Sequence, residues 1–169
     1  SEYKNMLKFA TTQKKHPVGI RVPAEFSEID TCDNTDYTIY NKNKIVLNGN
    51  TVAIFAIGKM MDMALDIAKK VKQDKNLDIT VINPLFLTGL DETLLNDLKK
   101  NHKLVITLED GELMGGYGQN ISSFYGTSDI LVKNFGISKK FHTDFTAEDL
   151  LKENGMSVEN ISNIIENML

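Results

Sequence analysis

Two acidic residues and a group of glycines near the middle of this 169-residue chain have types and spacing that could support chemistry. Glu109 and Asp110 follow the apolar run 104–108, and residues 115–118 are Gly-Gly-Tyr-Gly. Two neighbouring carboxylates can act as general acid and general base. Glycines at the start of a helix can bring backbone amides close to an anion. Either chemistry would lie where the carboxyl ends of parallel strands meet.

For the acids and the glycines alike, a structural role has more support in the sequence than either of these chemistries. Carboxylates that are neighbours in sequence at a strand end usually point apart, so we predict that Glu109 and Asp110 accept hydrogen bonds from nearby backbone or from a partner subunit. The glycines do not complete a dinucleotide fingerprint, because Ile121 stands where a third glycine belongs. We expect them to allow a close turn before a helix, and Gly58 to form a plain turn at another strand-to-helix corner.

Metal binding and nucleophilic catalysis have no support in the sequence. The three histidines, His16, His102 and His142, have no second histidine or cysteine at ligand spacing. His102 lies in a lysine-rich segment and is expected to be exposed. No nucleophile elbow and no phosphate loop occurs. We therefore predict no catalytic residue and no metal ligand in this chain.

Composition narrows the class of protein further. The net charge of −4 argues against non-specific binding of nucleic acid, which needs clustered basic residues. No apolar run approaches the roughly 20 residues of a membrane helix. Cys32 is the single cysteine, so no disulfide forms within the chain, and a reducing, cytoplasmic setting fits.

Apolar runs and helical periodicities alternate at intervals of roughly 25 residues, the rhythm of crossover units in an α/β domain with a largely parallel sheet. The expected strands cover residues 18–22, 37–40, 44–47, 51–57, 77–82, 104–108 and 130–132. The expected helices include 3–13, a helix after Gly58, one begun by Asp91, one after Gly118, one begun by Thr146 and a last one begun by Ser157.

The dipeptide Asn48-Gly49 is a strong signal for a tight turn. It predicts a hairpin in which strands 44–47 and 51–57 pair antiparallel. The sheet should therefore be mixed, with the antiparallel strand at one edge. In the helix after Gly58, one face is apolar and should pack on the sheet; it is formed by Met60, Ala64, Ile67, Ala68 and Val71.

Several motifs together are similar, in order and spacing, to the C-terminal part of the 1-deoxy-D-xylulose-5-phosphate synthases, which are thiamin-diphosphate enzymes of the transketolase superfamily. They lie at residues 17–23, 52–58, 80–86 with Leu90-Asp91, 107–110 with 115–118, and 135–137 with Phe141 and 146–151. The resemblance covers nearly the whole chain. It implies a three-layer α/β/α sandwich over a five-stranded, mixed and mostly parallel sheet with one antiparallel edge strand.

The resemblance also implies a division into domains. Residues 1–23 would be the last helix and strand of a pyrimidine-binding domain, 24–42 a linker, and 43–169 the transketolase C-terminal domain. The chain would then be a piece of a longer enzyme. Its partners would be the rest of that enzyme and a second copy in a homodimer, and its share of the work would be dimer formation and support of the pyrimidine domain.

In the parent reaction that the resemblance implies, pyruvate and glyceraldehyde 3-phosphate join with loss of CO₂ to give an isoprenoid and vitamin precursor. Such enzymes hold thiamin diphosphate through Mg²⁺ with a Gly-Asp-Gly motif. No Gly-Asp-Gly occurs in this sequence. We therefore expect this chain to bind neither cofactor nor metal and to be inactive by itself.

One substrate-binding position departs from the family. Arg21 is kept, whereas the position of the arginine that contacts the substrate phosphate is occupied by Ala24. Losing such a charge-assisted contact removes about 1.5–3 kcal/mol of binding, so we expect a divergent relative of the synthases that accepts another aldehyde or none. Two alternatives stay open: the C-terminal part of a transketolase or 2-oxo-acid dehydrogenase β chain, and a non-catalytic module that binds a partner or an anion.

Overall fold

The structure, a computed structural model, describes residues 2–22, 35–143 and 145–169. The chain divides into two compact units, Ser1–Tyr40 and Asn41–Leu169. Most of the predicted linker, 24–42, lies outside the described residues, so the predicted domain boundaries stay predictions. Among the described residues, no helix is both long enough and apolar enough to cross a bilayer.

The N-terminal unit contains the expected first helix but neither of the expected strands. Helix α1 (Glu2–Thr12) has no buried residue. Residues 18–22 form no strand, because no described segment offers them a neighbouring strand to bond with. Residues 37–40 form a turn instead. Asp36 explains it: its carboxylate accepts the Thr38 N–H at 2.9 Å, which favours a turn over an extended chain.

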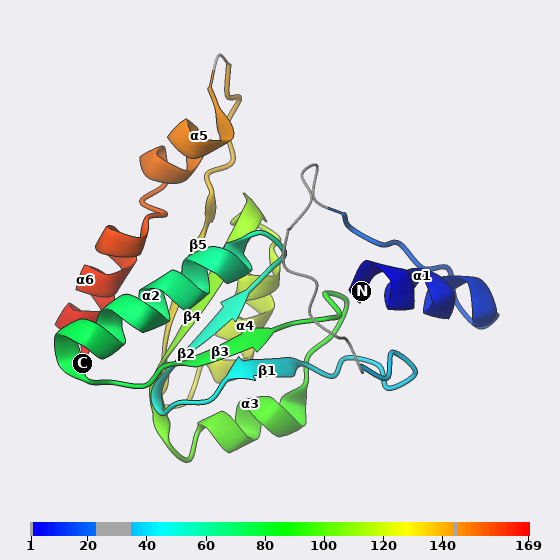
Figure 1. The fold of residues 1–169 in the computed structure, drawn as a ribbon, viewed down its shortest axis with the longest axis horizontal. Coiled ribbons are helices and arrows are strands. Elements are labelled where there is room, and N and C mark those ends of the chain that lie inside the picture. The colour runs from blue at the N-terminus through cyan, green and yellow to red at the C-terminus, as the bar shows by residue number, and fades with distance from the viewer. Residues whose placement is uncertain (1, 23–34, 144) are drawn as a thin grey trace. The chain divides into compact units, whose positions relative to one another are not determined.

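The C-terminal unit is built on one five-stranded sheet in the order β1-β3-β2-β4-β5 (Figure 1). Strand β1 is antiparallel to β3, and the other neighbours are parallel. The strands are β1 (Lys44–Leu47), β2 (Thr51–Ala56), β3 (Thr80–Asn83), β4 (His102–Glu112) and β5 (Leu131–Ile137). The mixed sheet with an antiparallel edge strand is confirmed.

Helices cover both faces of the sheet and give the predicted three layers (Figure 1). One face packs against α2 (Met60–Lys75) and α6 (Val158–Met168), with the short α5 (Ala147–Glu153) nearby. The other face packs against α3 (Glu92–Leu98) and α4 (Tyr117–Tyr125).

The central strand β2 shows how the two cores arise. Its alternate side chains Val52 and Ile54 enter the core under α2, whereas Ala53 and Phe55 enter the core under α3 and α4. All of these side chains are fully buried, as the unbroken apolar run predicted. The apolar face predicted for α2 is also buried as predicted.

The predicted hairpin between β1 and β2 is wrong. Strand β1 pairs with β3, so the connection at residues 48–50 passes across the amino end of β3 instead of turning back on β1. The Asn50 N–H donates to the carbonyl oxygen of Asp78 at 2.9 Å. Gly49 lies against the same backbone, where a Cβ atom would overlap Asp78 and Ile79. Glycine is needed at position 49 because the chain passes close to the backbone that precedes β3, and not because it forms a two-residue turn.

The predicted helix caps are confirmed. The Asp91 carboxylate accepts the Leu94 N–H at the start of α3, and the Ser157 hydroxyl accepts the Asn160 N–H at the start of α6. At the start of α5, Thr146 and Asp149 form a reciprocal capping box. These local signals depend on neighbours in sequence, which explains why they could be found without the fold.

Candidate functional site

At the corner between β4 and α4, the side chain of Glu109 is hydrogen-bonded to the start of α4. The Glu109 side chain is 5% exposed, and its two carboxylate oxygens accept the N–H groups of Tyr117 at 2.8 Å and Gly118 at 2.7 Å. These amides open α4, where the helix dipole favours a negative charge. The expected structural role of Glu109 is confirmed.

This arrangement argues against both chemistries considered for this corner, which are acid–base catalysis by Glu109 and anion binding by the amides that open α4. Glu109 has each oxygen engaged by a backbone amide, so it cannot exchange a proton with a substrate without breaking the start of α4. The amides that could have held a phosphate are already bound to this carboxylate. Gly118 is needed for close packing, because a Cβ there would overlap the side chains of Thr107 and Asn134.

A second buried acid fixes the start of the C-terminal unit. Asp91 is 6% exposed and caps α3, and it also accepts the Asn43 N–H at 3.1 Å and a bond from Lys42 Nζ at 3.1 Å. These contacts tie residues 42–43 to α3. Sequence reasoning found the cap and missed this long-range contact, for which the sequence carries no local signal.

Two buried tyrosines lie on α4, and Tyr117 is close to both of these acids, but they do not form an acid–base site. Burial, the largest cause, raises the pKa of Tyr117 to about 12, so its hydroxyl stays protonated at neutral pH. The Tyr125 hydroxyl donates to the carbonyl oxygen of Leu95 at 2.8 Å, and burial raises the pKa of Tyr125 as well. Both rings serve packing between α4 and its surroundings.

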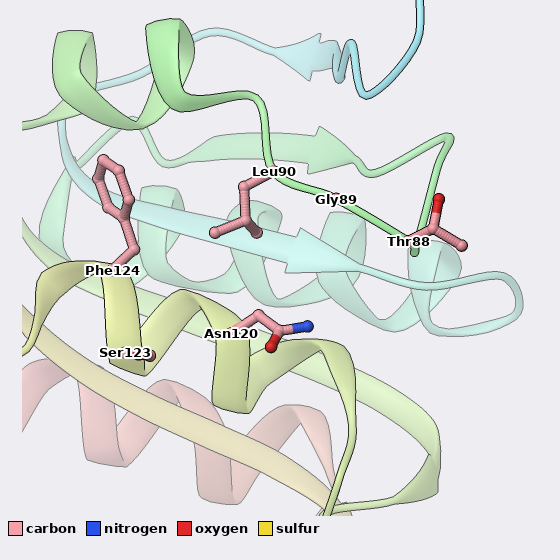
Figure 2. Close-up of a pocket in the computed structure, with 6 residues that line it drawn as sticks. All are labelled: Thr88, Gly89, Leu90, Asn120, Ser123 and Phe124. Carbon is pink, nitrogen blue, oxygen red and sulfur yellow. The ribbon is translucent and has the colours of Figure 1, made fainter.

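A shallow, open cleft of about 370 Å³ lies between the loop that precedes α3 and helix α4 (Figure 2). Leu90 and Phe124 supply apolar surface, and Asn120 supplies an amide. The remaining lining residues are Thr88, Gly89 and Ser123. No lining residue carries a charge, so the cleft has no feature that would select an anion.

The prediction that His102 is exposed is wrong. His102 begins β4, and its side chain is half-buried: Nδ1 lies 3.2 Å from the carbonyl oxygen of Leu98 and Nε2 lies 2.8 Å from Thr80 Oγ1. The Thr80 hydroxyl in turn accepts the Gly49 N–H at 3.1 Å. Burial, opposed by the bond to Leu98, lowers the pKa of His102. The neutral ring suits this network, because Nδ1–H donates to Leu98 while Nε2 accepts from Thr80.

We expect His102 to make stability depend on pH. Its lowered folded-state pKa means that the unfolded chain takes up a proton more readily below about pH 6.5, so the free energy of unfolding falls as pH drops through that range. Urea denaturation between pH 7 and pH 5 should show this slope, bounded by about 1.4 kcal/mol per pH unit for one proton. His102→Gln should make the slope shallower, and identical slopes in the two proteins would contradict the assignment.

The other predicted site residues do not converge on a centre. Arg21 lies in the N-terminal unit, outside any helix or strand, and is exposed, whereas Ala24 falls outside the described residues. Gly58 adopts a positive φ of 56° at the start of α2, as a turn residue would. No group of three potential metal ligands gathers within the ranges that the structure describes.

With the geometry established, the chain can be placed among known proteins. The model of the family described as transketolase, C-terminal domain, matches residues 41–161. The chain belongs to this family. The match begins where the C-terminal unit begins, at residue 41, and covers all five strands of the sheet.

Curated relatives of this transketolase C-terminal domain chain extend the likeness into the N-terminal unit. It is 32% identical to the 1-deoxy-D-xylulose-5-phosphate synthase of Alkaliphilus oremlandii over 165 residues, which are 95% of this chain and 26% of the relative. It is 34% identical to the Clostridium perfringens synthase over 133 residues, 77% of this chain and 21% of the relative. The chain thus spans about a quarter of these relatives.

Solved structures agree on the fold. A split-gene transketolase, described as an inactive β4 tetramer, has a TM-score of 0.68 at 23% identity, covering 88% of this chain and 46% of that one. A transketolase from Campylobacter jejuni has a TM-score of 0.54 at 18% identity, covering 76% and 19%. At these identities the likeness concerns the architecture, and it matches the predicted sandwich.

Proposed function

We propose that this chain is the C-terminal part of a thiamin-diphosphate-dependent transferase that makes 1-deoxyxylulose 5-phosphate from pyruvate and glyceraldehyde 3-phosphate. In that enzyme it holds two subunits together and supports the pyrimidine domain, in the cytoplasm. The observation that carries the proposal is the identity of about one residue in three with 1-deoxy-D-xylulose-5-phosphate synthases across 95% of the chain.

The N-terminal unit supports the view that a larger protein surrounds this chain. Helix α1 is amphipathic and buries no residue, and Tyr3 and Leu7 on it are about half exposed. A helix with an apolar stripe is stable when that stripe is covered. We propose that residues 1–23 complete a pyrimidine domain, 24–42 form a linker and 43–169 form the C-terminal domain.

We place thiamin diphosphate and Mg²⁺ in the preceding domains of the parent enzyme. The sequence has no Gly-Asp-Gly motif, and the glycine-rich helix start that could receive a diphosphate is taken by the Glu109 carboxylate. A diphosphate brought there would meet a buried like charge. This chain therefore contributes no step through the cofactor, and its role is to position other domains.

We propose that Arg21 contacts the substrate and that Ala24 leaves the substrate phosphate less firmly held than in the related synthases. Ala24→Arg would restore a charge-assisted contact and lower the Michaelis constant for glyceraldehyde 3-phosphate by roughly ten- to a hundredfold. An unchanged constant would mean that the phosphate is bound elsewhere or that the natural aldehyde differs.

A chimaera tests the proposal. Residues 1–169 replace the matching segment of the Alkaliphilus oremlandii synthase, and formation of 1-deoxyxylulose 5-phosphate is measured with and without Ala24→Arg. We expect a dimeric enzyme that is active, with a raised Michaelis constant for the aldehyde that Ala24→Arg lowers. The control is the same synthase ending before the segment, which should be inactive. The proposal would be refuted by a folded, dimeric chimaera that forms no 1-deoxyxylulose 5-phosphate from pyruvate and glyceraldehyde 3-phosphate, with or without Ala24→Arg.

One observation favours a second candidate. A structure that matches 88% of this chain is described as a split-gene transketolase, inactive β4 tetramer. A two-chain transketolase or 2-oxo-acid dehydrogenase would use this segment in the same supporting way. Two results together would favour this candidate. The synthase chimaera would be inactive with pyruvate, and the same segment would restore activity to a transketolase that lacks its C-terminal domain.

A further inference from the structure

The dipeptide Asn-Gly occurs twice in this chain, as Asn48-Gly49 and as Asn154-Gly155. In this dipeptide the asparagine side chain is open to attack by the next backbone nitrogen, because glycine has no Cβ atom to obstruct the approach. The two copies therefore share one intrinsic reactivity. Any difference between them in the folded protein comes from their surroundings.

The reaction at such a dipeptide is deamidation. The glycine nitrogen gives its proton to solvent and forms a bond with the asparagine Cγ atom. The bond between Cγ and Nδ2 breaks, Nδ2 takes a proton from solvent and leaves as ammonia, and a cyclic imide remains. Water then opens the imide at either carbonyl, which gives aspartate or isoaspartate without any transfer of electrons. The ring can close only when the asparagine side chain and the glycine N–H are both free to move.

At Asn154-Gly155 each of these groups is hydrogen-bonded. Asn154 Oδ1 accepts the Ser138 N–H at 2.8 Å, and Nδ2 donates to the carbonyl oxygen of Leu150 at 2.8 Å. The Gly155 N–H donates to the carbonyl oxygen of Lys152 at 3.0 Å. Because Asn154 is the C-cap of α5, deamidation there would require the end of the helix to open.

At Asn48-Gly49 only the glycine is held. Asn48 is exposed, and its side chain has no hydrogen-bond partner in the part of the chain that the structure describes. The Gly49 N–H donates to Thr80 Oγ1 at 3.1 Å, and Thr80 Oγ1 also lies 2.8 Å from His102 Nε2. A single hydrogen bond, from Gly49 to Thr80, therefore restrains the groups that would form the imide.

The isoaspartate product at Asn48 does not fit the crossing at the amino end of β3. The imide nitrogen carries no hydrogen, so the bond to Thr80 is lost when the ring closes. Isoaspartate then adds its side-chain carbon to the backbone beside Gly49, where even a Cβ atom would overlap Asp78 and Ile79. The lengthened chain has to move away from β3.

We propose that Asn48 is a deamidation site of the folded protein, restrained by the hydrogen bond from Gly49 to Thr80, and that the fold shields Asn154. Formation of isoaspartate at Asn48 displaces the chain from the amino end of β3. The proposal involves neither the substrate nor the cofactor nor the contact between subunits, so it stands or falls independently of the function proposed above.

Peptide mapping by mass spectrometry tests the proposal on the full 169-residue chain during incubation at neutral pH. In concentrated urea, where neither site is held, we expect similar rates at Asn48 and Asn154. In the folded chain, checked by circular dichroism, we expect Asn48 to deamidate at least about tenfold faster, because two more hydrogen bonds must break at Asn154. Equal rates in the folded chain, or a faster reaction at Asn154, would overturn the proposal.

Thr80→Val tests the restraint itself, because it removes the acceptor of the Gly49 N–H. We expect Asn48 to deamidate about fivefold faster in this variant, as the loss of one such bond predicts. Asn154 is the control within the same molecule, and its rate should not change. A ratio of the two rates that does not rise would contradict the restraint assigned to Thr80.

The stability of the isoaspartate form gives a second measure that needs no variant at Thr80. Separated from the unmodified chain, this form should unfold at a lower urea concentration. The matched control is Asn48→Asp, which changes the charge in the same way without lengthening the backbone. It should leave the midpoint unchanged, because Asn48 is exposed. Equal midpoints for the isoaspartate form and the unmodified chain would show that the chain does not pass as closely to β3 as the proposal requires.

Discussion

We expect Glu109→Ala to lower the free energy of unfolding of this chain by about 3 kcal/mol in urea denaturation at pH 7. The substitution removes a buried carboxylate that accepts two backbone N–H groups at 2.8 and 2.7 Å. Charge-assisted bonds of this kind are worth roughly 1.5–3 kcal/mol each, and part of that gain offsets the cost of burying the charge. The amides of Tyr117 and Gly118 would then be buried without an acceptor, which is the larger part of the loss.

Glu112→Gln is the matched control, since Glu112 ends the same strand. Its side chain is 55% exposed, and its Oε2 atom lies 4.0 Å from Lys139 Nζ. An exposed ion pair of that length contributes little, so a change below about 0.5 kcal/mol is expected. Equal losses in the two variants would mean that the bonds to α4 do not account for the burial of Glu109, and the structural role assigned to it would be wrong.

Gly49→Ala is expected to cost about 3 kcal/mol in the same measurement. A Cβ at position 49 would overlap the backbone of Asp78 and Ile79, and backbone atoms in a packed sheet cannot move aside as a flexible side chain can. The substitution would also disturb the Gly49 N–H bond to Thr80 and, through it, the contact with His102. The loss therefore reflects the crossing of β3 and not the conformation of a turn.

The control for this prediction is Gly111→Ala, because a Cβ at Gly111 would meet no atom within 4 Å. A change within about 0.5 kcal/mol is expected there. If Gly49→Ala proved as mild as Gly111→Ala, the chain would not pass so close to β3, and the strand order β1-β3-β2 would lose its main local support.

The local signals of the sequence determined much of this protein. The period of 3.6 residues located the buried face of α2, and the unbroken apolar run located the central strand β2. Asp91, Ser157 and the Thr146 capping box marked where helices begin. Each of these features depends on residues within about one helical turn or along one strand, so the sequence contains all the information needed to find it.

The sequence predicted the location and the role of one candidate site residue, but not its hydrogen-bond partners. The sequence placed Glu109 beside a glycine-rich helix start and gave it a structural role, but only the structure showed that both its oxygens bind amides eight and nine residues away. The contact of Asp91 with residues 42–43 spans nearly fifty residues. Neither periodicity nor motif spacing predicts a contact between residues so far apart in the sequence.

Tertiary structure alone decided the order of the strands. Asn48-Gly49 has the composition of a hairpin turn, yet β3, which follows 30 residues later, lies between the two strands that it joins. A turn signal describes the backbone of two residues, whereas strand neighbours are chosen by burial of both faces of the whole sheet. For the same reason His102, hydrophilic in a lysine-rich stretch, became a half-buried partner of Thr80 once β4 took its place beside β2.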